Sequence, residues 1–256
     1  MKLITLNIWG GKVFQDLVDF IKAQAADTDV FCFQEVFNGA ERTRTEEAGG
    51  HLKGVVTDIY SVLEKTLPNF NGFHAEAGRF DVGEAKVPYG LAIFVRKGIE
   101  VRQQGYDEVF RLDEDLGLPD GMVVWNRLLQ HVSVPYGENE VTIFNLHGLY
   151  TGGGKDDGAA RLKQSERVKN IMNAFQGPKV LCGDFNLNPG TQSLTVLETG
   201  MTNLIKENGI TSTRSHYYPK DLKWADYILV SPEVKVKRFS VLSNVVSDHL
   251  PLELRF

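Results

Sequence analysis

Cysteine and long apolar runs are scarce in this sequence. Only two of its 256 residues are cysteines, Cys32 and Cys182, and each lies in a short apolar segment. Two buried thiols fit a reducing compartment and provide no framework of disulfide bonds. No apolar stretch reaches the roughly 20 residues that a membrane-spanning helix needs. Residues 2–6 also lack an apolar signal followed by a cleavage site. We therefore expect a soluble, cytoplasmic protein without a membrane span.

An excess of positive charge is also missing, because the formal net charge is −5. Nonspecific binding to nucleic acid rests on neutralising phosphates with lysine and arginine. The charge balance therefore argues against a protein that general basicity holds on nucleic acid. It does not exclude a metal-dependent nuclease, whose site must itself be acidic.

Two familiar catalytic motifs are incomplete. Residues 152–155 lack the glycine five places before Gly154 and the Ser or Thr after Lys155, so they form no phosphate-binding P-loop. The contiguous residues 247–249, Ser-Asp-His, cannot form the triad of a serine hydrolase, and the motif Gly-x-Ser-x-Gly is absent. No linker-like or low-complexity stretch divides the chain, so we expect one domain over residues 1–256.

The chain instead contains a repeated order of strands and helices. Apolar spacing predicts a strand, a helix and a strand over residues 3–8, 13–26 and 30–33. The same order returns over residues 140–146, 159–175 and 179–186. We interpret the repetition as two related halves around one site. Further strands are expected over residues 70–78, 91–96, 101–104, 123–134, 224–231 and 234–241 and at the C-terminus, helices over 55–67 and 194–199, and loops over 36–54, 79–90, 110–121 and 211–223. This pattern predicts one α/β sandwich.

Polar side chains stand at the ends of the predicted strands. In the segment Gly183-Asp-Phe-Asn186, Asp184 and Asn186 are two residues apart, so on an extended backbone they point to the same side. Gly183 lets the backbone turn closely there. The alternative is an Asx turn, in which Asp184 and Asn186 bond only to their own loop. The strand-end set is Asn7, Glu35, His147, Asp184, Asn186, Asp226, Asp248 and His249.

The composition of this set points to metal-assisted chemistry. It holds four carboxylates, two amides and two histidines but no cysteine, which suits a hard cation such as Mg²⁺ or Mn²⁺ rather than zinc. Hydrolysis of a phosphate ester needs a metal against the developing charge, a base for water and oriented donors. The set supplies each of these.

Five short motifs carry a resemblance to a known family. They are Leu6-Asn7, Gln34-Glu35, Gly183-Asp-Phe-Asn186, Asp226-Tyr227 and Ser247-Asp-His-Leu-Pro251. In this order they resemble the endonuclease/exonuclease/phosphatase family, and they extend over nearly the whole chain. The resemblance implies a four-layered α/β sandwich (DNase I-like), with two mainly antiparallel sheets packed face to face and helices outside. It also implies divalent-metal-dependent hydrolysis of phosphoester bonds.

The resemblance further assigns the metal ligands. It implies that Glu35 is the chief ligand of Mg²⁺ or Mn²⁺, with Asn7 and Asp248 beside it. Asp248 and His249 are adjacent on an extended chain, so we expect them to point to opposite sides and to have separate roles. Alone, Gln34-Glu35 would be better explained as a solvated strand end, because carboxylates are mostly exposed.

The resemblance assigns catalytic roles to the remaining residues of the set. It implies that His249 is the general base or contacts the phosphate, and that Asp226 orients it. Asp184 would position or activate the attacking water, and Asn186 would donate to the phosphate. His147 matches a second histidine that contacts the scissile phosphate. Structural explanations stay open: Asp226 could simply be the polar first residue of a strand, and His147 a buried histidine satisfied by one or two hydrogen bonds.

The substrate is left open among three hypotheses. The first is a nuclease or other phosphodiesterase, for which Lys155, Arg161 and Lys163 could meet a nucleic-acid backbone. The second is a phosphatase or phosphodiesterase of a small-molecule, inositol or lipid head group, which fits the acidic balance and the aromatic segment 214–219 equally well. The third, an inactive relative kept as a binding module, is disfavoured because no member of the strand-end set is missing. No protein partner is implied.

Two further residues are candidates for contact with the substrate. Tyr89 precedes a glycine in the predicted loop 79–90, and Arg127 lies in the segment Trp-Asn-Arg-Leu. An inward guanidinium at Arg127 would face a phosphate. A surface salt bridge would explain the same residue as well.

Overall fold

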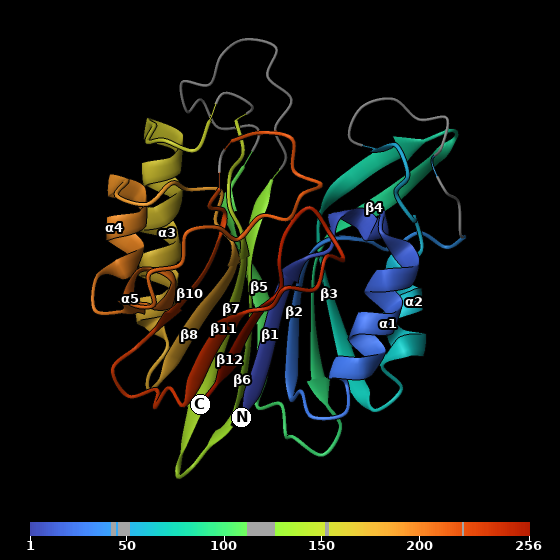
Figure 1. Cartoon of the computed structure of the whole chain (residues 1–256). Coiled ribbons are helices and arrows are strands. Elements are labelled where there is room, and N and C mark those ends of the chain that lie inside the picture. Colours follow the sequence, from blue (N-terminus) through green and yellow to red (C-terminus); the bar gives the residue numbers. More distant parts are fainter. Residues whose placement is uncertain (42–44, 46–51, 112–125, 152–153, 222) are drawn as a thin grey trace.

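Two six-stranded sheets pack face to face in the computed structural model of the chain, and helices cover their outer faces (Figure 1). The structure describes residues 1–41, 45, 52–111, 126–151, 154–221 and 223–256. The four layers confirm the predicted α/β sandwich. Among the described helices, none combines the length and apolarity needed to cross a bilayer. The cytoplasmic location stays a prediction.

The first sheet has the strand order β11-β12-β1-β2-β4-β3. Its central strands β1 and β2 are parallel, and Asn7 on β1 stands beside Gln34 on β2. Both strands are almost entirely buried because each is covered on both faces. The strand bounds are β1 (Lys2–Asn7), β2 (Val30–Phe37), β3 (Phe70–Val82), β4 (Ala85–Arg96), β11 (Arg238–Val241) and β12 (Leu252–Arg255).

The second sheet has the strand order β5-β6-β7-β8-β10-β9. Its central strands β7 and β8 are parallel, and their last residues, His147 and Asp184, stand side by side. On the other edge of β8, the antiparallel β10 places Asp226 beside Asp184. The bounds are β5 (Gln103–Phe110), β6 (Arg127–Tyr136), β7 (Asn139–His147), β8 (Lys179–Asp184), β9 (Thr202–Asn203) and β10 (Asp226–Val230).

The two sheets repeat one topology, as the sequence pattern suggests. In each, a parallel central pair is joined by a helix, namely α1 (Phe14–Gln24) between β1 and β2 and α3 (Ala159–Ala174) between β7 and β8. In each, two antiparallel strands flank the pair on one side and two on the other. The chain therefore consists of two halves of equal strand order and direction.

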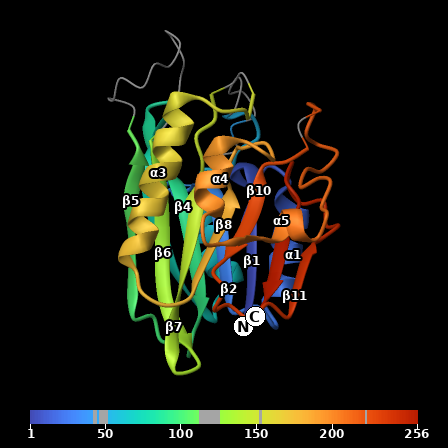
Figure 2. The ribbon, with the colours of Figure 1, turned by 90° about the vertical axis from the view of Figure 1, so that its left-hand side faces the viewer.

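The helices divide between the two outer faces. The helices α1 and α2 (Ile59–Thr66) cover the first sheet, whereas α3, α4 (Gln192–Glu198) and α5 (Leu204–Glu207) cover the second (Figures 1 and 2). Each half buries its apolar strand residues on both faces of its sheet. On β1 and β2, Leu3 and Cys32 face the second sheet, whereas Ile4, Phe31 and Phe33 pack towards α1 and α2. The alternation follows from the two-residue period of a strand.

A polar contact joins the two sheets close to the strand ends. The Gln34 amide Nε2 on β2 donates to the Asn145 side-chain oxygen on β7 at 2.6 Å, and the Asn145 amide donates to the Phe33 carbonyl at 3.1 Å. All three residues are buried. Since buried polar groups must be paired, these bonds fix the relative position of the two sheets near the ends of their central strands.

Three sequence-based expectations need correction. Residues 79–90 form no loop but most of the β3–β4 hairpin, whose turn lies at Gly83 with φ of 59°. The pairing of β3 with β4 shifts register between Glu76 and Gly78, close to where the strand expected at 70–78 was to end. The predicted loop 36–54 begins later because β2 continues to Phe37. The strand expected at 101–104 lies at Gln103–Phe110 instead. The sequence analysis did not predict α5, and most of the predicted loop 110–121 lies outside the described residues.

Candidate active site

The predicted strand-end residues meet in one cavity of about 290 Å³ at the end of the sandwich where the parallel central strands finish. Six of the eight line it: Glu35, His147, Asp184, Asn186, Asp248 and His249. The other two are bonded directly to these, since the Asn7 amide contacts Glu35 and Asp184, and Asp226 contacts His249. Side chains from both halves of the chain therefore build a single site.

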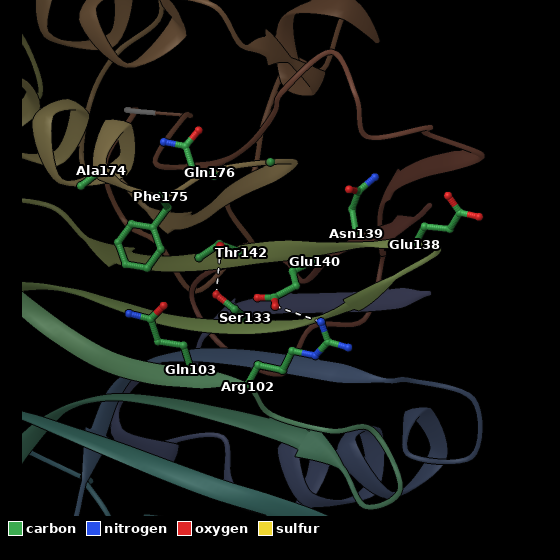
Figure 3. A pocket seen from close by; sticks show the side chains of 11 residues that line it. Arg102, Gln103, Ser133, Glu138, Asn139, Glu140, Thr142, Ala174, Phe175 and Gln176 are labelled. Carbon is green, nitrogen blue, oxygen red and sulfur yellow. Dashed lines mark hydrogen bonds and ion pairs between the residues drawn. The ribbon is translucent and has the colours of Figure 1, made fainter.

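A larger cavity of about 600 Å³ lies elsewhere, between the β6–β7 hairpin, the start of β5 and the residues after α3 (Figure 3). Its polar groups bind one another. Arg102 pairs with Glu140 at 2.9 Å, and the hydroxyls of Ser133 and Thr142 are 2.9 Å apart. No buried carboxylate or imidazole cluster is found among the residues lining it. We therefore place the chemistry in the smaller cavity.

Glu35 reaches the cavity through a distortion of β2. The pairing with β4 shifts register between Gln34 and Val36, and Glu35 between them has a positive φ of 58°. Its neighbours stay buried, while its own side chain is 28% exposed and faces the site. Burial and the nearby charge of Asp248 raise the pKa of Glu35. A bound cation would relieve this repulsion between carboxylates.

Backbone strain is concentrated at the site. Among the described residues, the non-glycine positions with positive φ are Trp9 at 52°, Glu35 at 58° and Asn186 at 52°. All three line the cavity. Such conformations cost about 1–3 kcal/mol each and persist only where surrounding contacts hold them. These three residues therefore lower the stability of the fold, and their strained backbones place their side chains at the cavity.

Asn7 connects the two halves. Its amide nitrogen donates to Glu35 Oε1 and to Asp184 Oδ2, each at 3.1 Å. Its side-chain oxygen accepts from the backbone N–H of Trp9 at 3.0 Å. In this arrangement Asn7 bridges two carboxylates from different sheets. Its role as a metal ligand stays a prediction.

Asp184 takes part in both arrangements that the sequence left open. Its Oδ1 accepts from the Asn186 backbone N–H at 3.0 Å, which is the Asx turn. Its Oδ2 faces the site and lies 3.5 Å from His249 Nε2 and 3.8 Å from His147 Nε2. Burial opposes ionisation, but the positive charges near it, first of all at His249, outweigh burial and hold the pKa of Asp184 well below its usual range. Asp184 is therefore an ionised carboxylate whose Oδ2, which also accepts from the Asn7 amide, faces the site.

His249 and Asp226 form a hydrogen-bonded pair. His249 Nδ1 donates to the Asp226 carboxylate at 2.8 and 2.9 Å, and Thr213 Oγ1 donates to Asp226 Oδ2 at 2.8 Å. These bonds leave Nε2 as the nitrogen that faces the site. Burial and Arg214 lower the pKa of His249, but the carboxylates of Asp226, Asp248 and Asp184 outweigh them and raise it.

Asp248 and His249 do not point to opposite sides, contrary to the sequence-based expectation. The chain bends over residues 246–248 instead of continuing as a strand, so both side chains turn towards Arg214. Arg214 Nη1 donates to Asp248 Oδ2 at 2.8 Å and to His249 Nε2 at 2.5 Å. Arg214 was not predicted as a site residue, because a lone arginine in a polar loop carries no pattern. Only the tertiary contact identifies it.

His147 lies across Asp184 from His249, and two residues contact the ring nitrogen that faces away from Asp184. Its Nδ1 is 3.2 Å from both the Tyr89 hydroxyl and Arg127 Nη1. Because a guanidinium can only donate, Nδ1 is the acceptor and Nε2 carries the hydrogen that points to Asp184. Burial and Arg127 lower the pKa of His147 well below its ordinary value, so the ring is neutral. Arg127 is buried here, and the surface salt bridge considered for it is wrong.

Three acidic side chains offer oxygens to a cation in this cavity: Glu35, Asp184 and Asp248. Oxygen donors of this kind suit Mg²⁺ or Mn²⁺. Asp184, Asp226 and His249 also have ligand atoms within 4.8 Å of one another. However, Asp226 already accepts bonds from His249 and Thr213, so we regard that group as the orienting pair beside Asp184.

Two of the three basic residues that follow His147 are not available to nucleic acid. Lys155 is fully buried and donates to the Trp224 carbonyl at 2.7 Å. Arg161 is buried and donates to the carbonyls of Asp156 and Leu149. The predicted contact of these two with a nucleic-acid backbone is therefore wrong, because both serve the protein's own backbone. Lys163 lies exposed on α3.

Comparison with known structures agrees with the fold. A protein of the endonuclease/exonuclease/phosphatase family from Leptotrichia buccalis C-1013-b superposes with a TM-score of 0.70 at 19% identity, over 100% of this chain and 98% of that one. A mannosyl-6-phosphatase from Bacteroides thetaiotaomicron VPI-5482 gives 0.67 at 19%, over 100% and 98%. The catalytic domain of human nocturnin with bound sulfate gives 0.66 at 17%, over 99% and 92%. At these identities the structures show the shared fold.

The search of curated proteins gave no match. The sequence profile of the endonuclease/exonuclease/phosphatase family, however, matches residues 4–249, which include every residue of the strand-end set. Members of this family hydrolyse phosphoester bonds. The chain belongs to the endonuclease/exonuclease/phosphatase family.

Proposed function

We propose that this protein is a Mg²⁺- or Mn²⁺-dependent phosphoester hydrolase whose reaction takes place between His249 and His147. The observation that carries the proposal is the position of Asp184. Its Oδ2 oxygen lies 3.5 Å from His249 Nε2 and 3.8 Å from His147 Nε2, while Asp226 holds the far side of His249. A carboxylate between two oriented imidazoles can hold a water molecule while an imidazole contacts the phosphate.

The acidic side of the cavity would hold the cation. Glu35 and Asp248 supply carboxylate oxygens, and Asn7 keeps Glu35 in place through its amide. A bound divalent cation supplies a Lewis acid against the negative charge that develops on the phosphate. The hard oxygen donors fit Mg²⁺ or Mn²⁺, and a cation would offset the burial and the Asp248 charge that raise the pKa of Glu35.

The remaining residues handle the water and the phosphate. Asp184 is ionised and accepts a hydrogen bond from the attacking water, and His249 takes or returns the proton through Nε2. Asp226 keeps the His249 ring in this orientation. His147 is neutral and donates to a phosphate oxygen through Nε2. Asn186 lines the same cavity and adds a donor.

We infer a small phosphoester or a head group as the substrate rather than duplex nucleic acid. The cavity of about 290 Å³ stands at the lower end of the range for small-molecule sites, about 300–1,000 Å³. Aromatic side chains such as Trp9, Phe80 and Tyr218 wall it in. Lys155 and Arg161, which a nucleic-acid surface would need, are buried.

A hydrolysis panel tests the proposal. The substrates are p-nitrophenyl phosphate, bis-p-nitrophenyl phosphate, sphingomyelin, single-stranded oligonucleotide, RNA and plasmid DNA, each with Mg²⁺, Mn²⁺ or EDTA. We expect turnover of a small ester, loss in EDTA, and a fall of about 10²–10⁴-fold in His249→Ala and Asp184→Asn. Glu140→Gln, in the distant cavity, is the matched control. Turnover of DNA or RNA alone would reject the substrate class, and full activity of His249→Ala would reject the mechanism.

A further inference from the structure

Arg214 holds two atoms that the proposed reaction requires. Its Nη1 donates to Asp248 Oδ2 at 2.8 Å and to His249 Nε2 at 2.5 Å, and its side chain is only 7% exposed. Asp248 is an expected cation ligand, and Nε2 is the His249 atom that faces the site. One guanidinium therefore connects the cation side of the cavity with the imidazole that handles the proton.

These contacts and the reaction exclude each other. His249 Nε2 has a single lone pair, so it cannot accept from Arg214 while it receives a proton from water. A cation on Asp248 would also lie against the positive guanidinium, and two like charges a few ångströms apart repel strongly in a buried site. Arg214 must leave both partners before the cation, His249 and a phosphate can act together.

The backbone around Arg214 is fixed, so the movement belongs to its side chain. On one side, Thr213 binds Asp226 through its hydroxyl and the Lys223 carbonyl through its N–H. On the other side, the Ser215 N–H donates to the Asp248 carbonyl at 3.0 Å, and its hydroxyl donates to the Ser247 carbonyl. A long side chain on an anchored backbone can change rotamer without moving the loop.

The surroundings offer the guanidinium a second position. Its charge lies 3.9 Å from the centre of the Tyr218 ring, which also lines the cavity, so the side chain can slide along an aromatic face. Its Nε is buried and has no acceptor among the described residues, and the same is true of the Nε of Arg127. Both arginines line the cavity. A phosphate there would supply the missing acceptors, since a guanidinium binds phosphate oxygens in pairs.

We propose that Arg214 is a movable cation that couples metal binding to phosphate binding. When no cation is bound at Asp248, the Arg214 guanidinium neutralises the acidic cluster and occupies His249 Nε2. When a divalent cation takes Asp248, the guanidinium is displaced along Tyr218 and binds the phosphate opposite Arg127. Arg214 is thus a positioning residue in one state and a substrate-binding residue in the other. The inference rests on the proposed function, because it assumes a cation site at Asp248.

Calorimetric titration of Mn²⁺, with and without inorganic phosphate, tests the coupling without measuring turnover. The proteins are wild type, Arg214→Gln, Arg214→Lys and the control Arg102→Gln, whose arginine pairs with Glu140 in the distant cavity. In wild type, phosphate should strengthen Mn²⁺ binding by at least about fivefold, the lower range of allosteric coupling. In Arg214→Gln, Mn²⁺ alone should bind on the order of tenfold more tightly, because a competing charge is gone. Phosphate should then add no further affinity.

The variants separate the possible failures. Arg214→Lys keeps the charge but not the paired donors, so it should keep the weak binding of Mn²⁺ alone and lose most of the phosphate effect. A wild-type protein that binds no Mn²⁺ would refute the cation site of the proposed function itself. If wild type binds Mn²⁺ and Arg214→Gln has the same affinity and the same phosphate effect, only the role of Arg214 is refuted. Unfolding curves confirm that each variant is folded. If Arg214→Gln does not fold, the phosphate effect on Mn²⁺ binding in Arg214→Lys tests the role of Arg214.

Discussion

Replacing Gly183 with alanine tests whether the close approach of two strand ends builds the site. Gly183 precedes Asp184 on β8 and has a φ of 128°, which side chains of L-residues rarely adopt. A Cβ atom there would lie 2.1 Å from the Leu146 carbonyl oxygen on β7, where real contacts are essentially never below 3.0 Å. The obstacle is backbone, so it cannot rotate away. β7 and β8 must separate where His147 stands beside Asp184.

The expected loss has two parts. A non-glycine residue in a sparsely populated backbone region costs about 1–3 kcal/mol. Forcing an extra carbon into packed surroundings costs about 1–3 kcal/mol more. We therefore expect Gly183→Ala to lower the free energy of unfolding by about 4 kcal/mol, a large part of the roughly 5–15 kcal/mol that is usual for proteins. For a chain of this size the melting temperature should fall by roughly 8–16 °C.

Substitutions at two other glycines separate the cost of backbone strain from the cost of steric overlap in one assay. Gly200 has a positive φ of 69°, but no atom lies within 4 Å of the place that a Cβ would take, so Gly200→Ala measures backbone strain alone. Gly78 has neither a positive φ nor a neighbour within 4 Å, so Gly78→Ala should change stability by less than about 0.5 kcal/mol. Urea unfolding followed by circular dichroism gives all three values. The reasoning fails if Gly183→Ala is no less stable than Gly200→Ala.

Three further outcomes follow from buried groups. Burial lowers the pKa of Lys155 to about 8 from 10.5. The unfolded chain then binds more protons between pH 8 and 10.5, so this group makes unfolding harder as pH rises through that window, by up to about 3 kcal/mol. Urea titrations at pH 7.5, 8.5 and 9.5 should show that the free energy of unfolding rises less with pH in Lys155→Met than in wild type. An equal rise in both proteins would contradict this. Cys32 and Cys182 are fully buried, and burial raises the pKa of Cys32, so a thiol reagent at pH 8 should label them only after denaturation. Tyr89→Phe removes one bond to His147 and should cost about 1 kcal/mol of stability in the same unfolding assay.

Part of the strand-end set could be predicted from the sequence because a local rule places these residues. An apolar run predicts a buried strand, and the residue that ends the run stands at the edge of the sheet. Asp184 and His147 illustrate this, since each ends a strand of the parallel central pair. Two such units in one chain then predict that their ends meet, provided that the sheets pack face to face.

The residues that the sequence left undecided or missed depend on contacts between distant segments. Arg214 acquires its role only because residues 246–248 bend and bring Asp248 and His249 to the same side. Tyr89 was placed in the predicted loop 79–90, where it precedes Gly90. In the structure Gly90 is needed inside β4, since a Cβ there would lie 1.8 Å from the Ala75 carbonyl oxygen. Gly90 therefore permits a close approach of β3 and β4 that the sequence alone does not reveal.

The site lies at the seam between the two halves of the chain, and this explains why its geometry depends on the whole fold. The Asn7 amide reaches from the first sheet to Asp184 on the second at 3.1 Å, and the Gln34–Asn145 bond crosses the same seam at 2.6 Å. Neither half alone contains both the Glu35 carboxylate and the His249–Asp226 pair in contact with Asp184. Any change that lets the sheets slide must therefore move the cation side of the cavity away from the side that handles the proton, even when every catalytic residue is kept.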